Sequence, residues 1–395
     1  MKTEFIFENV AQQIAIELRN KSYLTCGLLS GDFGKIIYLY EYSKINPSYA
    51  KTADELLQKL FDTYRSTQYI PTYCGGIAGF GIGLHILENS KYVSGANNYL
   101  SDIDNYLSIC LQNFLTNSNL DFLHGASGLG YYFEIRARKN NKTAKECIYR
   151  YIDNLERTAI IGKTGDKEYI KWKFDNNEKS KEYNISLSHG LSSVAILLTR
   201  IYKNFNDASL NDRILRLLDG ITNYLLSQRI NQFYYGSFFP TFPKECAPLN
   251  KSRLAWCYGD LGISTALLHI SNVTHNKCAF STALGVAEFA AKNRLSPSKN
   301  AVYDSGICHG SSGVAQYFSR IYDLTNNPIF YNAYDFWKNI TLNHCVVTDC
   351  QVNFPSYDAS SKGWKNNTYI LEGNAGCALM LMKSDNILNS ILLYE

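Results

Sequence analysis

Two cysteines and a histidine in the C-terminal half of the sequence have the residue types of a metal-binding site. Cys308 and His309 are adjacent and stand before Gly310, and Cys257 stands at the corresponding point before Gly259. A zinc ion bound by two cysteines and one histidine keeps a fourth coordination position for a substrate or water. The long separation between the cysteines is unlike the short paired spacings of zinc fingers. The sequence therefore predicts one catalytic zinc ion per chain, bound by Cys257, Cys308 and His309.

The glycines beside these residues belong to a repeat that predicts the fold. A Gly-x-x-Gly pattern, or a close variant, occurs seven times, and an apolar stretch such as 194–198 follows it each time, whereas stretches before the pattern, such as 211–228, are amphipathic. An amphipathic helix covers a core, a helix that is apolar on all sides is buried, and glycine permits a tight turn between them. The first glycines are Gly31, Gly76, Gly125, Gly190, Gly259, Gly310 and Gly373, and the second positions are Gly34, Gly79, Gly128, Ser193, Gly262, Gly313 and Gly376.

This repeat predicts an all-α fold in which an outer helix, a turn and an inner helix alternate seven times. Unequal intervals between the repeats favour closure into a ring over an open solenoid, whose repeats are usually uniform in length. No linker rich in Pro, Gly or Ser divides the chain, so we expect a single domain over residues 1–395. Short hairpins are predicted within 232–242 and 346–354. Residues 1–20 predict an amphipathic helix rather than a signal peptide.

The two positions before each first glycine hold most of the candidate chemistry. In a ring these positions lie together at the N-termini of the inner helices, where partial positive charge favours thiolates. Neighbouring repeats are neighbours in a ring, so Cys257 can meet Cys308 and His309. His189 occupies the histidine position without a preceding cysteine, as does His124, whose role stays open. Packing as small apolar groups is the expected role of the core cysteines Cys26, Cys74, Cys110, Cys147 and Cys377.

The composition excludes several classes of protein. With 46% hydrophobic residues the 395-residue chain can bury a large core, which excludes a disordered chain. Its net charge of +4, without a dense Lys/Arg cluster, gives no indication of nucleic-acid binding. The sequence contains no apolar run of about 18 residues, so no transmembrane helix is predicted. Eleven cysteines, odd in number and irregular in spacing, indicate reduced thiols and a cytoplasmic location.

Taken together, the chain resembles the lanthionine synthetase C-like cyclases, which close thioether rings in lantibiotic peptides. The resemblance covers nearly the whole chain, because all seven turns fit, and it implies an α/α toroid of seven inner and seven outer helices. Two segments resemble the zinc motifs of the family, and a third resembles its histidine motif: Trp256-Cys257-Tyr258-Gly259, Cys308-His309-Gly310 and Ser188-His189-Gly190. The matches to the active-site aspartate, arginine and tyrosine of the family are Asp121, Arg253 and Tyr258.

The resemblance implies a zinc-dependent cyclase that adds peptide cysteine thiols to dehydroalanine or dehydrobutyrine. Its substrate would be a dehydrated ribosomal precursor peptide. His189 would act as acid or base, Asp121 would orient it, and Arg253 and Tyr258 would stabilise the enolate that forms. A chain of this length has little room for a dehydratase domain, so dehydration would need a separate enzyme. An export transporter is the other expected partner, and the location would be cytoplasmic or peripheral at the inner face of the membrane.

Three features depart from the family pattern. Ser193 replaces a glycine, which would alter how its helix seats, and Leu123-His124 puts a histidine where a small residue is expected. The aromatic segment between Gln228 and Arg253 is either a substrate surface or a rim loop folded onto the rest of the chain.

Two other functions remain open from the sequence. The first is a non-catalytic member of the same family that binds zinc and a thiol such as glutathione, or a partner protein, although Tyr258 favours the cyclase type. The second is a glycosidase, which needs two facing carboxylates. Asp121, Asp260 and Glu372 lie near turns, but no pair is marked out. A structural ion pair is the alternative role for Asp121 and Arg253.

Overall fold

The computed structural model is mostly helical and describes residues 3–64, 70–174, 182–205, 207–348, 351–358 and 362–395. Seven of its helices begin directly after the first glycine of a predicted turn, and that glycine is the N-cap residue each time. The predicted turn positions are therefore confirmed. These helices are α2 (Asp32–Tyr42), α4 (Ile77–Asn89), α6 (Ala126–Ala137), α8 (Leu191–Asn204), α11 (Asp260–Thr274), α13 (Ser311–Thr325) and α15 (Asn374–Leu381).

A second helix precedes each turn, as the repeat predicted. The helices that follow the turns are the more deeply buried set; every residue of α2 and of α6 is buried. The amphipathic helix predicted for residues 1–20 is confirmed as the first of the preceding set. That set is α1 (Thr3–Asn20), α3 (Ser48–Tyr64), α5 (Ala96–Thr116), α7 (Lys142–Thr158), α9 (Ala208–Ser227), α12 (Lys277–Asn293) and α14 (Pro328–Asn343).

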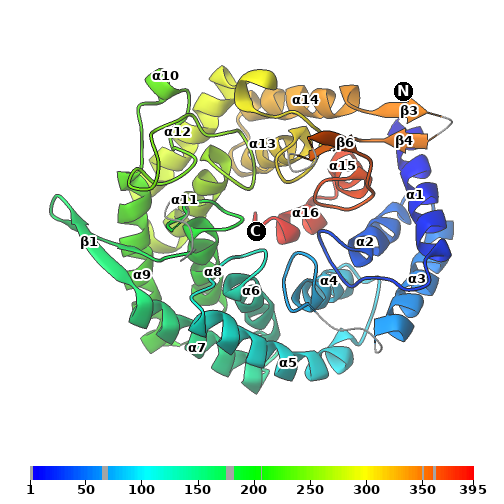
Figure 1. The fold of residues 1–395 in the computed structure, drawn as a ribbon, viewed down its shortest axis with the longest axis horizontal. Coiled ribbons are helices and arrows are strands. Elements are labelled where there is room, and N and C mark those ends of the chain that lie inside the picture. The colour runs from blue at the N-terminus through cyan, green and yellow to red at the C-terminus, as the bar shows by residue number, and fades with distance from the viewer. Residues whose placement is uncertain (1–2, 65–69, 175–181, 206, 349–350, 359–361) are drawn as a thin grey trace. The chain divides into compact units, whose positions relative to one another are not determined.

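The chain divides into two compact units. The continuous unit is Ser101–Arg294, and the split unit combines Met1–Leu100 with Leu295–Glu395. Within the continuous unit α6, α8 and α11 pack in that order, and each also packs against the helix that follows it, α7, α9 or α12 (Figure 1). Within the split unit the packing order is α13, α15, α2 and α4, so helices from the two ends of the chain meet. The single domain over 1–395 stays a prediction.

Backbone hydrogen bonds hold neighbouring turns in register inside each unit. They join the residues at the first of the two positions before the glycine. Such a bond fixes which side chains of adjacent turns face the same way, because it aligns equivalent residues. In the continuous unit the N–H of Leu123 donates to Ser188 and that of Ser188 to Cys257; in the split unit Cys308 donates to Leu371, Leu371 to Leu29 and Leu29 to Cys74.

The second glycine of the turn is explained by a close backbone approach. A Cβ atom on Gly313 would lie 1.9 Å from the carbonyl oxygen of Ile307, which no side chain can tolerate. The N–H of Gly313 donates to the carbonyl of Gly306. At the departure from the pattern, both the N–H and the Oγ of Ser193 donate to Gly190 instead. Ser193 therefore changes the hydrogen bonding at the start of α8.

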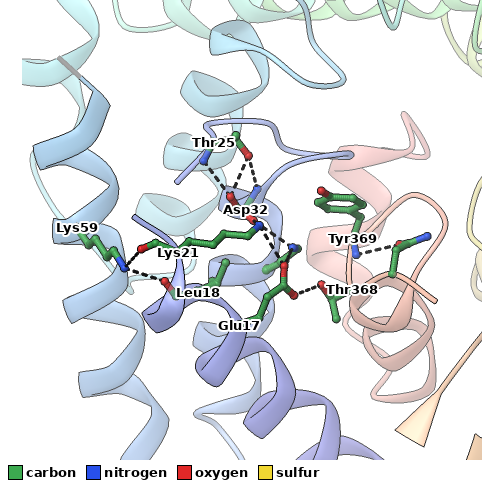
Figure 2. A network of polar contacts seen from close by, with 10 residues as sticks. Glu17, Leu18, Lys21, Thr25, Asp32, Lys59, Thr368 and Tyr369 are labelled. Carbon is green, nitrogen blue, oxygen red and sulfur yellow. Dashed lines mark hydrogen bonds and ion pairs between the residues drawn. The ribbon is translucent and has the colours of Figure 1, made fainter. Parts of the chain in front are cut away.

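A polar network ties α1 and α2 to the segment that precedes α15 in the split unit (Figure 2). The ammonium of Lys21 lies 2.6 Å from Asp32, and the fully buried Lys35 bonds to Glu17 at 2.6 Å. Glu17 in turn accepts a hydrogen bond from the hydroxyl of Thr368. Burial raises the pKa of Asp32, but the bonds from Lys21 and from the Thr25 backbone outweigh it and hold that pKa below its usual value. The network therefore joins the N-terminal and C-terminal parts of the split unit through paired charged groups.

The described strands form three short antiparallel pairs. The pair β3 (Val346–Thr348) and β4 (Gln351–Asn353) confirms the hairpin predicted within 346–354. The pairs β1 (Ile160–Thr164) with β2 (Lys167–Lys171), and β5 (Ser356–Asp358) with β6 (Gly363–Lys365), were not predicted.

The hairpin predicted within 232–242 is wrong. Residues Gln232–Tyr235 form the short helix α10. The side chain of Asn231 accepts the N–H groups of Phe233 and Tyr234, and Gly236 closes the helix with φ of 82°. A local cap thus prevails over the strand preference of the aromatic residues.

The remaining elements are short. Among the described residues they are the helix α16 (Asp385–Ile391) and the 3₁₀ turn η2 (Ser298–Asn300). Within the described residues, none of the helices combines the length and the apolar character that a transmembrane span requires.

Candidate active site

Asp121 and His189 form the closest polar pair among the predicted catalytic residues. Oδ2 of Asp121 lies 2.6 Å from Nδ1 of His189, and both residues sit in turns of the continuous unit. Oδ1 of Asp121 accepts the backbone N–H of His124 at 2.7 Å, which fixes the carboxylate in its own turn. The Asp121 carboxylate therefore holds one ring nitrogen of His189 and leaves Nε2 for other chemistry.

The surroundings of His189 favour its charged form. Burial lowers the pKa of His189, but the hydrogen bond and charge of Asp121, with a smaller contribution from Cys257, outweigh it and raise the pKa above its usual value. The ring of His124 stacks 6.0 Å from that of His189, and burial lowers the pKa of His124. The two shifts run in opposite directions, so a proton is favoured on His189 over His124.

Cys257 and Tyr258 lie in the turn next to that of His189. The carbonyl of Cys257 accepts the N–H groups of Leu187 and Ser188, and the Cys257 side chain is buried. The ring of Tyr258 is 5.8 Å from the ring of His189. Burial raises the pKa of Tyr258, so its phenol stays protonated near neutral pH and can donate a hydrogen bond. These contacts bring His189, Tyr258 and Cys257 together with Asp121.

The segment that carries Arg253 is not helical. Arg253 therefore does not lie one helical turn before Cys257. Gly259 adopts φ of 85°, and a Cβ there would lie 2.8 Å from the carbonyl oxygen of Arg253. This conformation suits glycine, and it lets the chain fold back so that the main chain of Arg253 reaches the start of α11.

Cys308 and His309 lie in the split unit, in the turn before α13. The His309 side chain is 21% exposed. Nε2 of His309 lies 3.5 Å from Oδ2 of Asp304, and Nδ1 lies 3.9 Å from Oε1 of Glu372. Sequence reasoning missed Asp304. Its only signal is its place six residues before Gly310, where three other turns carry asparagine.

Asp260 anchors part of the aromatic segment in the continuous unit. Its carboxylate, fully buried, accepts the N–H groups of Phe238 and Phe239 and an N–H of Arg294 at 2.8 Å. It is therefore not available as a glycosidase carboxylate. Phe233 and Tyr234, by contrast, are 83% and 80% exposed. The segment 228–253 is thus partly folded onto the unit and partly presented to solvent.

The remaining cysteines take several environments. The ten described cysteines are free of disulfide bonds. Burial of Cys74, Cys147 and Cys377 confirms the prediction that they pack in the core. Cys26 and Cys110 are only half-buried, so the same prediction is not confirmed for them.

Comparisons with known proteins agree with this architecture. The sequence model of the family described as "Lanthionine synthetase C-like protein" matches residues 22–390. The nisin biosynthesis protein NisC of Lactococcus lactis subsp. lactis is 25% identical over 338 residues, which span 80% of this chain and 74% of NisC. A solved structure of nisin cyclase superposes with a TM-score of 0.74 at 21% identity, covering 98% of this chain and 96% of that one. The structural similarity confirms the predicted α/α toroid fold class.

Proposed function

This chain belongs to the lanthionine synthetase C-like protein family, and we propose that it works as a lantibiotic cyclase. The proposed reaction adds a cysteine thiol of a precursor peptide to dehydroalanine or dehydrobutyrine and forms a thioether ring. The observation that carries the proposal is the hydrogen bond between the side chains of Asp121 and His189, next to the turn of Cys257. A protein that only binds thiols needs no such acid–base pair.

The proposed metal ligands are Cys257, Cys308 and His309. They offer two thiols and one imidazole, a set that could hold a metal ion. This donor set suits zinc, and carboxylates beside His309 are the usual surroundings of a metal-bound histidine. Zinc, when bound, would ionise a peptide thiol, whose pKa is otherwise about 8.5.

Residues of the continuous unit would stabilise the negative charge that develops during the addition and would supply the proton that completes it. When the thiolate attacks the β-carbon, an enolate forms, and its α-carbon must take up a proton. The raised pKa of His189 suits it to give that proton from Nε2, while Asp121 holds Nδ1. Tyr258, protonated near neutral pH, and the fixed cation of Arg253 would stabilise the enolate oxygen.

The proposed substrate is a ribosomally made peptide whose Ser and Thr residues a separate dehydratase has already converted. An export transporter would take the product, and the protein would act in the cytoplasm or at the inner face of the membrane. These partners follow from the proposed reaction, because dehydration must precede the addition and a secreted peptide must cross the membrane.

Removal of the metal should reduce ring closure to the uncatalysed rate. The measurement is thiol alkylation followed by mass spectrometry of a dehydrated peptide with wild-type protein, with chelator-treated protein and after zinc is restored. Thiols also add spontaneously, so a reaction without protein supplies the reference rate and ring pattern. Equal rates for wild-type and metal-free protein would contradict the cyclase assignment and favour a non-catalytic, thiol-binding member of the family.

Asp121→Asn should move the alkaline limb of the pH–rate profile to lower pH. The substitution removes the charge that raises the pKa of His189 and leaves the burial that lowers it, so the pKa should fall. The profile of kcat/KM reports this pKa, and zinc content should not change. His124→Gln is the matched control, because His124 stacks on His189 without bonding to it. A profile that stays in place would contradict the proposed role of Asp121.

A further inference from the structure

Four turns share a side chain that closes the turn from within. An Asn or Asp six residues before the first glycine accepts the N–H of the residue two positions later, at 2.9 to 3.2 Å. Asparagine and aspartate make this turn equally well, because only one side-chain oxygen takes part. The closing residues are Asn119, Asn184, Asp304 and Asn367. The turn alone therefore does not explain why position 304 holds an aspartate and the other three hold asparagine.

The surroundings of Asp304 supply the explanation. Its side chain is 2% exposed. Oδ1 accepts the N–H of Gly306 at 3.0 Å, and Oδ2 accepts the N–H of Tyr357 at 3.1 Å. A buried carboxylate needs a compensating partner, and Nε2 of His309 lies within ion-pair distance of Oδ2. The two backbone bonds hold Asp304 in place, so it can fix the orientation of the imidazole.

We propose that Asp304 is a positioning residue that keeps the proton of His309 on Nε2, so that Nδ1 is the atom His309 offers to the metal ion. The inference rests on the proposed function only in taking His309 as a ligand. Glu372, 3.9 Å from Nδ1, has a side chain that is 45% exposed. Asp304 is the more deeply buried of the two carboxylates, and two backbone N–H groups hold it. A carboxylate that accepts the second N–H of a metal-bound histidine fixes its tautomer and raises its basicity.

Asp304→Asn in the full-length protein tests the affinity. The asparagine can keep the bond to the Gly306 N–H, as it does in the other turns, and it removes the charge. The zinc dissociation constant, measured by competition with a chelator, should rise about 10- to 100-fold. Glu372→Gln removes the other carboxylate near His309 and should raise the constant less than Asp304→Asn does. Unchanged affinity in Asp304→Asn, or the larger loss in Glu372→Gln, would overturn the inference.

A second measurement does not depend on stability. In zinc-loaded protein labelled with ¹⁵N-histidine, long-range ¹H–¹⁵N correlations distinguish a protonated ring nitrogen from a metal-bound one. His309→Ala identifies the His309 signals. The expected spectrum has a proton on Nε2 and metal on Nδ1, whereas metal on Nε2 would overturn this inference alone. Wild-type protein that takes up no zinc would overturn the metal assignment together with it.

Discussion

Cys308→Ala should leave the purified protein without zinc and without catalysed ring closure. The predicted site has three protein ligands, so the loss of one thiolate leaves two, too few to retain the ion through purification. Cys257→Ala and His309→Ala should behave in the same way. Elemental analysis gives the zinc content, and the alkylation assay gives the rate. The fold should survive, since a catalytic ion on a large buried core is not its main source of stability.

Two control variants make this result specific. Cys377→Ala changes another cysteine of the split unit, fully buried with its Sγ 3.1 Å from the carbonyl of Ser305, and should keep both zinc and activity. His189→Ala should keep zinc and lose turnover. Stoichiometric zinc in all three ligand variants would show that the assignment is wrong. Loss of zinc from His189→Ala would make His189 a ligand.

Arg294→Met should destabilise the protein by about 3–5 kcal/mol, because it removes one partner of a buried ion pair and leaves the other charge behind. A guanidinium nitrogen of Arg294 lies 2.8 Å from Oδ2 of Asp260, and neither side chain is more than 1% exposed. Burial raises the pKa of Asp260 even with Arg294 present, so without its partner the carboxyl should take up a proton. The loss should appear as a lower midpoint of urea unfolding.

The same substitution should loosen the aromatic segment. Asp260 also accepts the N–H groups of Phe238 and Phe239, so limited proteolysis should cut within 228–253 faster than in the wild type. Arg216→Met is the control, because Arg216 is 74% exposed and its pair with Glu156 should contribute less than about 1 kcal/mol. An unfolding midpoint in Arg294→Met equal to that of the control would refute the prediction.

The glycine repeat made most of the helical fold predictable. Each first glycine caps a helix, and the missing Cβ of the second glycine admits a backbone carbonyl, as at Gly313. Both requirements are local, so they leave a mark in the sequence. The hairpin of β1 and β2 also has a local signal in the sequence, Gly165-Asp166. The helix α10 departs from the prediction because the Asn231 cap prevails over the strand preference of the aromatic residues that follow it.

The candidate site was predictable only where the repeat sets the register. The contact of Asp121 with His189 follows from two adjacent turns, which the backbone bond between Leu123 and Ser188 aligns. For Asp304 the repeat marks a turn position but does not predict its partners. Its partner Tyr357 reaches it from a distant strand, and no sequence spacing encodes that contact. The zinc ligands and the catalytic roles stay predictions.

The packing of α15 against α2 determines the order in which the two units can fold during synthesis. The N–H of Leu371 donates to Leu29, and the hydroxyl of Tyr73 donates to the carbonyl of Ile391. A ribosome releases the first hundred residues long before these partners exist, whereas the continuous unit is complete at Arg294. The continuous unit can therefore fold before the residues after Arg294 have been synthesised, and the split unit is completed last. A nascent chain arrested before α15 would leave the apolar face of α2 uncovered, a surface that chaperones and proteases recognise.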